Sequence, residues 1–163
     1  MASIFTDTND NSYEINITGD LTGEDYTSNG LTKSNVKTAI LGTNVTSIGF
    51  DAFFDASSLT SVTIPDGVTS IGDNAFAAAY SLTSITFGTD SQLTSIGVNA
   101  FADTQLTSIA IPDGVTSIGN DAFAGATRLN SIIVDTFNSH YTSVDGVLFN
   151  KNKSILIQYP NGK

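Results

Sequence analysis

The only histidine of the chain, His140, is the first residue to test for catalysis. It lies in the string Asn-Ser-His-Tyr at 138–141 of a 163-residue sequence. A Ser-His-Asp triad needs a serine and a carboxylate held against the imidazole, and no nucleophile-elbow pattern occurs in the sequence. We therefore interpret His140 as a loop residue. We predict no enzymatic activity, no catalytic residue and no cofactor.

Acidic side chains raise the question of a calcium site. The run at 7–12 begins like an EF-hand loop, but its sixth residue is serine where glycine is required, and Thr18 stands where the bidentate glutamate belongs. Cysteine is absent, so a thiolate metal site is excluded. Three turn aspartates, Asp66, Asp90 and Asp113, could line up along one edge of the fold and bind an ion weakly. We favour the interpretation that they are solvated turn residues, and we predict no metal site.

The charge balance restricts the class of partner. Sixteen acidic side chains against six basic ones give a formal charge of −10. A field of this sign repels phosphates, so we expect neither nucleic acid nor an anionic membrane as partner. No apolar run approaches the ~20 residues that cross a bilayer, so membrane insertion is not expected. The first residues lack a basic segment followed by an apolar stretch, so no signal peptide is predicted in this chain, although one could have been removed.

A repeat of about 23 residues organises the chain. The string VTSIG, or LTSIG, is followed each time by an Ala-Phe pair and occurs at 45–49, 68–72, 93–97 and 115–119. A second string, of the type LTSVTI, occurs at 59–64, 82–87, 106–111 and 129–134, with a degenerate copy, VKTAIL, at 36–41. The period implies that one structural unit recurs.

Each unit carries the same local signals. The string LTSVTI alternates like a short strand, with Leu59, Val62 and Ile64 inward and with Ser61 and Thr63 outward. A Pro-Asp-Gly turn and a second short extended segment follow it. An aspartate or asparagine precedes every Ala-Phe pair: Asp51, Asn74, Asn99 and Asp121. Because these residue types favour helix N-caps, the pattern predicts that a single helical turn follows each of them and points its Phe inward.

One such unit cannot bury a core of its own, so neighbouring units must stack into a solenoid. Exposed stacking faces need caps. We predict one structural domain with an N-terminal cap at 1–35, repeats at 36–134 with a partial first copy, and a C-terminal cap hairpin at 135–163. Within the first cap, residues 13–18 alternate like an edge strand, and residues 19–35 form a loop or a helical turn over the first coil.

The combined pattern L-x-x-I-x-I-P-x-x-V-x-x-I-G-x-x-A-F resembles the leucine-rich repeats of the BspA-like, or Treponema pallidum, class over about residues 36–163. The resemblance implies a β-rich solenoid, a right-handed curved ribbon with a parallel sheet on its concave side and with short second strands and single helical turns on its convex side. It also implies a cell-surface or secreted protein. The cysteine often found three residues after the Phe is missing, and small residues predict a tight, buried place there: Ala56, Ala79, Thr104 and Ala126.

The outward rows of the first strands are the candidate ligand surface. They consist of Thr38, Ser61, Ser84, Ser108 and Ser131, and of Ile40, Thr63, Thr86, Ala110 and Ile133. Stacking at ~4.8 Å would turn them into a regular lattice of hydroxyls and methyls. Aromatics that break the repeat could anchor a partner. Of these, Tyr80 joins the candidate surface, whereas Phe50 and Phe54 are expected beneath the N-terminal cap.

These features support a non-enzymatic interaction module that binds a protein or extracellular-matrix ligand through Ser61, Thr63, Ser84, Thr86, Ser108, Ser131, Ile133 and Tyr80. One alternative is a glycan- or ice-binding Ser/Thr surface. Another is a structural segment of a longer repeat array, since the string DGVLFNKNKSILIQYPNGK looks like one that recurs inside BspA-like proteins. Ligand identity and oligomeric state stay open at this point.

Overall fold

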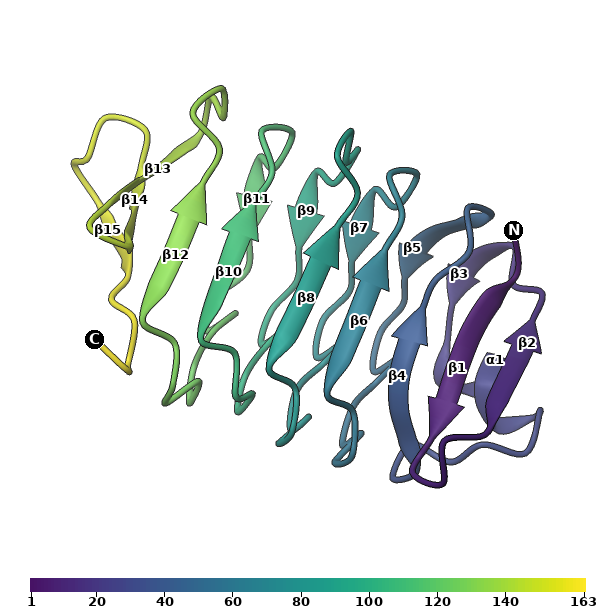
Figure 1. Ribbon diagram of the computed structural model, residues 1–163. Coiled ribbons are helices and arrows are strands. Elements are labelled where there is room, and N and C mark those ends of the chain that lie inside the picture. Colours follow the sequence, from purple (N-terminus) through teal and green to yellow (C-terminus); the bar gives the residue numbers. More distant parts are fainter.

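The computed structural model describes all residues, 1–163, as a row of stacked coils with the two termini at opposite ends (Figure 1). Fifteen short strands and one five-residue helix make up the regular structure. In chain order these are β1 (Ser3–Asp7), β2 (Ser12–Ile15), β3 (Gly19–Leu21), α1 (Gly23–Thr27), β4 (Val36–Ile40), β5 (Val45–Ile48), β6 (Ser61–Ile64), β7 (Ser70–Ile71), β8 (Ser84–Phe87), β9 (Ser95–Ile96), β10 (Ser108–Ile111), β11 (Ser117–Ile118), β12 (Ser131–Val134), β13 (Tyr141–Val144), β14 (Val147–Asn150) and β15 (Leu156–Gln158).

Successive repeats pair in parallel at equivalent positions. In what we call the first sheet, the order is β2-β1-β4-β6-β8, and β10-β12 form a separate ladder beyond it. The second sheet has the order β11-β9-β7-β5-β3 and is continuous. Ser61 of β6 lies opposite Ser84 of β8, and Ser70 of β7 lies opposite Ser95 of β9. Each repeat position therefore becomes a column along the stack, and the predicted solenoid is confirmed.

The core is a column of aliphatic side chains beside a column of stacked rings. Leu59, Val62 and Ile64 point inward as predicted, and each exposes at most 1% of its surface. The rings of successive repeats have centroids 5.2 to 5.8 Å apart and lie within 7° of parallel, in the order Phe53, Phe76, Phe101 and Phe123. Such ring pairs add stabilisation beyond the burial of their area.

The small residues three places after each Phe are buried, as predicted. Thr104 is the only polar residue among them, and its hydroxyl donates a hydrogen bond of 2.9 Å to the carbonyl of Phe101. A buried hydroxyl without a partner would destabilise the fold, so this bond explains why a threonine fits in a column that otherwise holds alanine.

The predicted helical turns are wrong. Asp51, Asn74, Asn99 and Asp121 have φ between 53° and 56°, in the left-handed region, whereas an N-cap has extended backbone. The segments that follow are turns, in which alternate N–H groups donate to the next coil and the others to a carbonyl three residues back. One example is the bond of 2.7 Å from Phe53 N–H to the carbonyl of Ala75. Asp and Asn are the non-glycine residues that best tolerate this conformation, so they stand here because of the left-handed turn and not as helix N-caps.

The N-terminal end is built around a strand that the sequence pattern did not predict. Strand β1 lies between β2 and β4 and pairs antiparallel with both, so that β2 is the edge. Phe5 and Tyr26 extend the ring column to Phe53, with centroids 6.4 and 5.3 Å away. Phe50 and Phe54 were expected there, but they are 66% and 41% exposed, so that expectation is wrong.

The C-terminal end is a three-stranded antiparallel sheet of order β13-β14-β15. Its connection to β12 is held by Asn138, which is fully buried. The side-chain amide of Asn138 donates to the carbonyls of Pro112 and Val115, and its oxygen accepts from the N–H groups of His140 and Tyr141. Strand β15 forms the edge, and its apolar neighbours Ile155 and Tyr159 stay largely exposed.

Candidate functional site

The first sheet is interrupted between β8 and β10, and this interruption is the main irregularity of the solenoid. No ladder joins the two strands, although Gln105 N–H still reaches the carbonyl of Leu82 just before them. Elsewhere the same two coils remain bonded, for example from Thr116 N–H to the carbonyl of Thr94. The regular lattice predicted over five strands is therefore split into a three-strand and a two-strand part.

The loop after β8 leans away from β10. It is longer than the Pro-Asp-Gly turns of the neighbouring repeats. Asp90 N–H donates to a carboxylate oxygen of Asp66 at 3.0 Å, and Gln92 N–H donates to the carbonyl of Asp66 at 2.8 Å. Both bonds hold the loop against the preceding coil. They leave a space between residues 88–91 and the following turn at 112–113.

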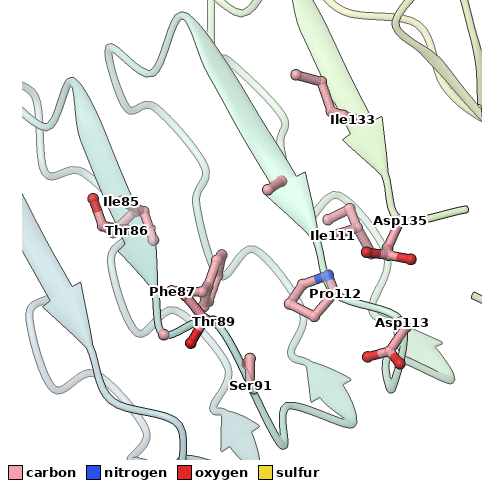
Figure 2. Close-up of a pocket in the computed structure, with 12 residues that line it drawn as sticks. Ile85, Thr86, Phe87, Thr89, Ser91, Ile111, Pro112, Asp113, Ile133 and Asp135 are labelled. Atoms are coloured by element: carbon pink, nitrogen blue, oxygen red, sulfur yellow. The ribbon is translucent and has the colours of Figure 1, made fainter. Parts of the chain in front are cut away.

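The separation opens a groove of about 400 Å³ into the core. Ile85 and Phe87 occupy inward positions, yet both are only half-buried, whereas their counterparts Ile109 and Ile111 on β10 are at most 2% exposed. Figure 2 shows Phe87 on one side of the gap and Pro112 on the other. The phenyl ring stands where the neighbouring repeats have Ile64, Ile111 and Val134, so the largest side chain of this column lies at the gap.

The rim of the groove combines apolar and acidic side chains. Ile133 on β12 is 56% exposed beside it. Asp113 and Asp135 are exposed at the end where the strands finish (Figure 2). No lysine or arginine occurs between residues 38 and 127, and neither Asp113 nor Asp135 makes an ion pair. The site is an apolar slot with a negatively charged end.

Two of the eight predicted surface residues, Thr86 and Ile133, line this groove. Ser61 and Thr63 lie in register with Ser84 and Thr86 on the larger part of the first sheet, and Ser108 pairs with Ser131 on the smaller part. Tyr80 is 55% exposed in a turn and does not line the groove. These six residues remain a proposed surface.

Sequence reasoning missed the half-buried floor of the groove, Ile85 and Phe87, and the acidic rim. Two signals could have found it. One is Phe87 in a column that otherwise holds leucine, isoleucine and valine, and the other is the 24-residue step from Ser84 to Ser108 where the neighbouring steps are 23. On the first sheet, this longer step coincides with the pair of strands at which the ladder stops.

The acidic run near the N-terminus is occupied by internal hydrogen bonds. The Asp7 carboxylate, which is almost fully buried, accepts from the N–H groups of Asn9 and Asn11, from the Asn11 side chain and from the Tyr13 hydroxyl. The Asn11 side-chain bond is the largest contribution that lowers the pKa of Asp7, against the opposing effect of desolvation. The hydrogen bond from the Tyr13 hydroxyl to Asp7 is the main cause that raises the pKa of Tyr13. Nowhere do three His, Cys, Asp or Glu side chains converge as they would around a metal ion.

His140 is exposed, and its Nδ1 lies 2.9 Å from the hydroxyl of Ser139. That serine is its only side-chain hydrogen-bond partner, so the carboxylate that would complete a triad is missing from the ring. The buried neighbour Asn138 holds the chain in place, and the loop interpretation of His140 agrees with its exposure.

Comparisons with solved structures agree with the fold. The pneumococcal vaccine antigen PcpA is 27% identical with a TM-score of 0.69, and the match covers 77% of this chain and 37% of that one. A leucine-rich repeat protein from Eubacterium ventriosum is 28% identical with a TM-score of 0.67, covering 93% and 46%. One from Bacteroides ovatus is 32% identical with a TM-score of 0.61, covering 78% and 31%. The chain thus spans less than half of each of these proteins.

A search of curated proteins finds no match. None of the helices is long and apolar enough to cross a bilayer. The family description "BspA type leucine rich repeat region" matches residues 26–156 in six copies. With its stacked parallel strands and its repeated Phe column, the chain belongs to the BspA-type leucine-rich repeat family.

Proposed function

We propose that the protein is a non-enzymatic binding module that takes a protein or extracellular-matrix ligand on the outer face of its first sheet, at the cell surface or outside the cell. One observation carries the proposal: the groove between β8 and β10 partly exposes the core residues Ile85 and Phe87, and the exposed Ile133 of β12 lines the same groove. Exposed apolar patches with polar rims are typical of protein interaction sites.

Similar proteins support both the proposed binding of a protein and the proposed location at the cell surface. Leucine-rich repeat proteins generally bind other proteins, and one similar structure is a vaccine antigen. Repeat families bind unrelated partners on one fold, so the identity of the ligand has to come from the site itself.

An array of purified extracellular-matrix proteins tests this function. The unmodified chain should retain at least one of them, and the double variant Ala110→Lys with Ile133→Lys should lose that retention, because both charges would enter the groove. Ile40→Lys is the matched control, since Ile40 is 47% exposed on β4 of the same sheet, and the strands β6 and β8 separate it from the gap. Retention that survives the double variant, or an array without any bound protein, would contradict the proposal.

A second candidate function is glycan or ice binding, which a separate observation favours. Ser61 and Thr63 face Ser84 and Thr86 in register, and the hydroxyls of all four make no hydrogen bond within the protein. A compact block of free hydroxyls can bind sugar hydroxyls or ordered water.

Replacing Thr63 and Thr86 by lysine should then abolish retention on a glycan array or thermal hysteresis in freezing assays. Thr69→Lys is the control on the second sheet, where the Thr69 hydroxyl already donates to the carbonyl of Thr46. An unchanged response in the first variant would eliminate this candidate.

A further inference from the structure

The groove between β8 and β10 has a chemistry of its own that narrows the choice of ligand. One wall consists of the end of β8 and the loop after it, residues 85–89. The other consists of the end of β10 and its turn, residues 110–113, with Ile133 and Asp135 beyond them. The space between them follows the strand direction in Figure 2. A slot of this shape fits an extended chain better than a globular ligand.

The floor selects an apolar side chain. Ile85 and Phe87 are half-buried by the core and open toward the gap, and Ile111 closes the slot from β10. Burying an apolar side chain against this floor is favourable because it removes apolar surface from water. The volume of about 400 Å³ is within the range of small-ligand sites, so there is room for one large side chain with its neighbouring backbone.

The facing edges of the slot carry unpaired backbone groups. Because β8 and β10 share no ladder, the N–H and C=O groups that point into the gap lack the partners that every other adjacent pair of repeat strands supplies. Unpaired backbone at a strand edge is a ready partner for the backbone of an added extended segment.

The end of the slot selects positive charge. Asp113 and Asp135 are exposed there, and Asp135 keeps one carboxylate oxygen engaged with the N–H of Phe137 while the rest of its carboxylate faces solvent. Asp113 makes no side-chain hydrogen bond or ion pair. The net charge of −10 adds a long-range field that attracts a basic segment and speeds its encounter.

We propose that this groove binds an extended partner segment in which a large apolar residue is flanked by lysine or arginine. The apolar side chain enters between Phe87 and Pro112, and the flanking cations lie against Asp113 and Asp135. The proposal rests on the proposed function as a protein-binding module and names the chemistry of the ligand that the same site would take.

Three capped heptapeptides test the proposal with the complete chain. One alternates lysine and leucine, the second alternates glutamate and leucine, and the third alternates lysine and serine. Binding is followed by fluorescence anisotropy at low and high salt and by the methyl NMR signals of the protein. The lysine–leucine peptide should bind and should shift the methyl signals of Ile85, Ile111 and Ile133 but leave those of Ile40 unchanged. The lysine–serine peptide should bind at least tenfold more weakly, and the glutamate–leucine peptide should not bind.

Protein variants separate the two halves of the site. Asp113→Asn combined with Asp135→Asn should weaken the lysine–leucine peptide by about twofold to thirtyfold at low salt and flatten its salt dependence, because two exposed ion pairs are lost. Ala110→Lys should abolish binding. Asp55→Asn is the control, because it removes one negative charge in a distant turn and should leave the affinity within about twofold.

Three results would overturn the proposal: equal binding of the lysine–serine peptide, binding that Ala110→Lys does not reduce, or methyl shifts confined to residues outside the groove. These results can be told apart from a failure of the proposed function. A matrix protein that is retained through the groove while the lysine–leucine peptide fails to bind would leave the protein-binding function in place and remove only the basic–apolar segment as its ligand.

Discussion

The ring column gives a sharp test of how neighbouring coils stabilise one another, because residues 53 and 54 are both Phe and have opposite environments. Phe53 is fully buried, with three ring neighbours whose centroids lie 5.2, 5.3 and 6.4 Å away. Phe54 is 41% exposed and has no ring neighbour. Truncation to alanine should therefore have very different effects at two adjacent positions.

We expect Phe53→Ala to lower the free energy of unfolding by about 5 kcal/mol. Burial alone places a core Phe→Ala change at ~3–5 kcal/mol, and the three ring pairs place it at the upper end of that range. Phe123→Ala removes only one ring pair, at 5.8 Å, and should cost about 3–4 kcal/mol. Phe54→Ala should cost less than about 1 kcal/mol.

Urea titration followed by far-ultraviolet circular dichroism measures these differences, with thermal unfolding as a second readout. For a chain of 163 residues, Phe53→Ala should lower the Tm by about 10–20 °C and Phe54→Ala by less than about 4 °C. If Phe54→Ala cost as much as Phe53→Ala, or if Phe123→Ala cost more than Phe53→Ala, the ring column would not be what couples the N-terminal end to the repeats.

Three further outcomes are expected. Gly97→Ala should lower the free energy of unfolding by about 1–3 kcal/mol, because its Cβ would lie 2.5 Å from the backbone of the preceding coil, whereas Gly67→Ala, whose nearest atom would be 3.7 Å away, should be neutral in the same thermal scan. The folded-state pKa of Asp7 is lowered, so its carboxylate stabilises the fold above the unfolded value near 3.9, and this contribution is lost as pH falls through the lowered pKa. Urea titrations from pH 7 to 2 should show the gap between the unmodified chain and Asp7→Asn closing in that acidic range, and a gap independent of pH would contradict the assignment. Asn138→Ala should cost about 1–3 kcal/mol by leaving buried backbone groups unpaired, and His140→Ala should change stability by less than about 0.5 kcal/mol; equal effects in urea would refute this difference.

The inward columns could be predicted from the sequence because each is repeated at a fixed spacing. Val62 lies between Ser61 and Thr63, and a serine or threonine precedes each of its equivalents, so this period of two predicts which face is buried. The Phe column could be predicted for the same reason, because a large ring at one place in every coil has only the interior to enter. Repetition converts a weak local signal into a strong one.

The backbone conformation before each Phe could not be predicted, since Asp and Asn favour both N-caps and left-handed turns. What decides between them is the neighbouring coil. The N–H of Phe76 donates to the carbonyl of Ala100 at 2.8 Å, and a helical turn would direct that N–H along its own chain. The choice depends on contacts 24 residues away, which a local pattern does not contain.

The aromatic residues that cover Phe53 were mispredicted because the N-terminal end does not repeat, whereas the helical turn expected within residues 19–35 is present as α1. The aromatic residues of the first repeat seemed suited to fill the space above Phe53, but Tyr26 fills it from α1. Its hydroxyl donates a bond of 2.5 Å to the carbonyl of Ala52, and burial raises its pKa strongly. A tyrosine both covers the ring column and satisfies a carbonyl that has no preceding coil to pair with, which a phenylalanine cannot do.

The steps between coils vary in length on both sides of the solenoid, but only the first sheet loses its ladder. The step from Ser70 to Ser95 is 25 residues and the step from Ser95 to Ser117 is 22, yet the second sheet keeps its ladder through both. The added residues are taken up in the loop after β8, which bonds back to Asp66. On the first sheet the step to β10 is one residue longer than its neighbours, and Phe87, the largest side chain of its inward column, lies at that step. Replacing Phe87 by isoleucine should therefore narrow the groove and reduce ligand binding, while the second sheet is unaffected. The proposed site thus depends on a local departure from the repeat that the rest of the fold tolerates.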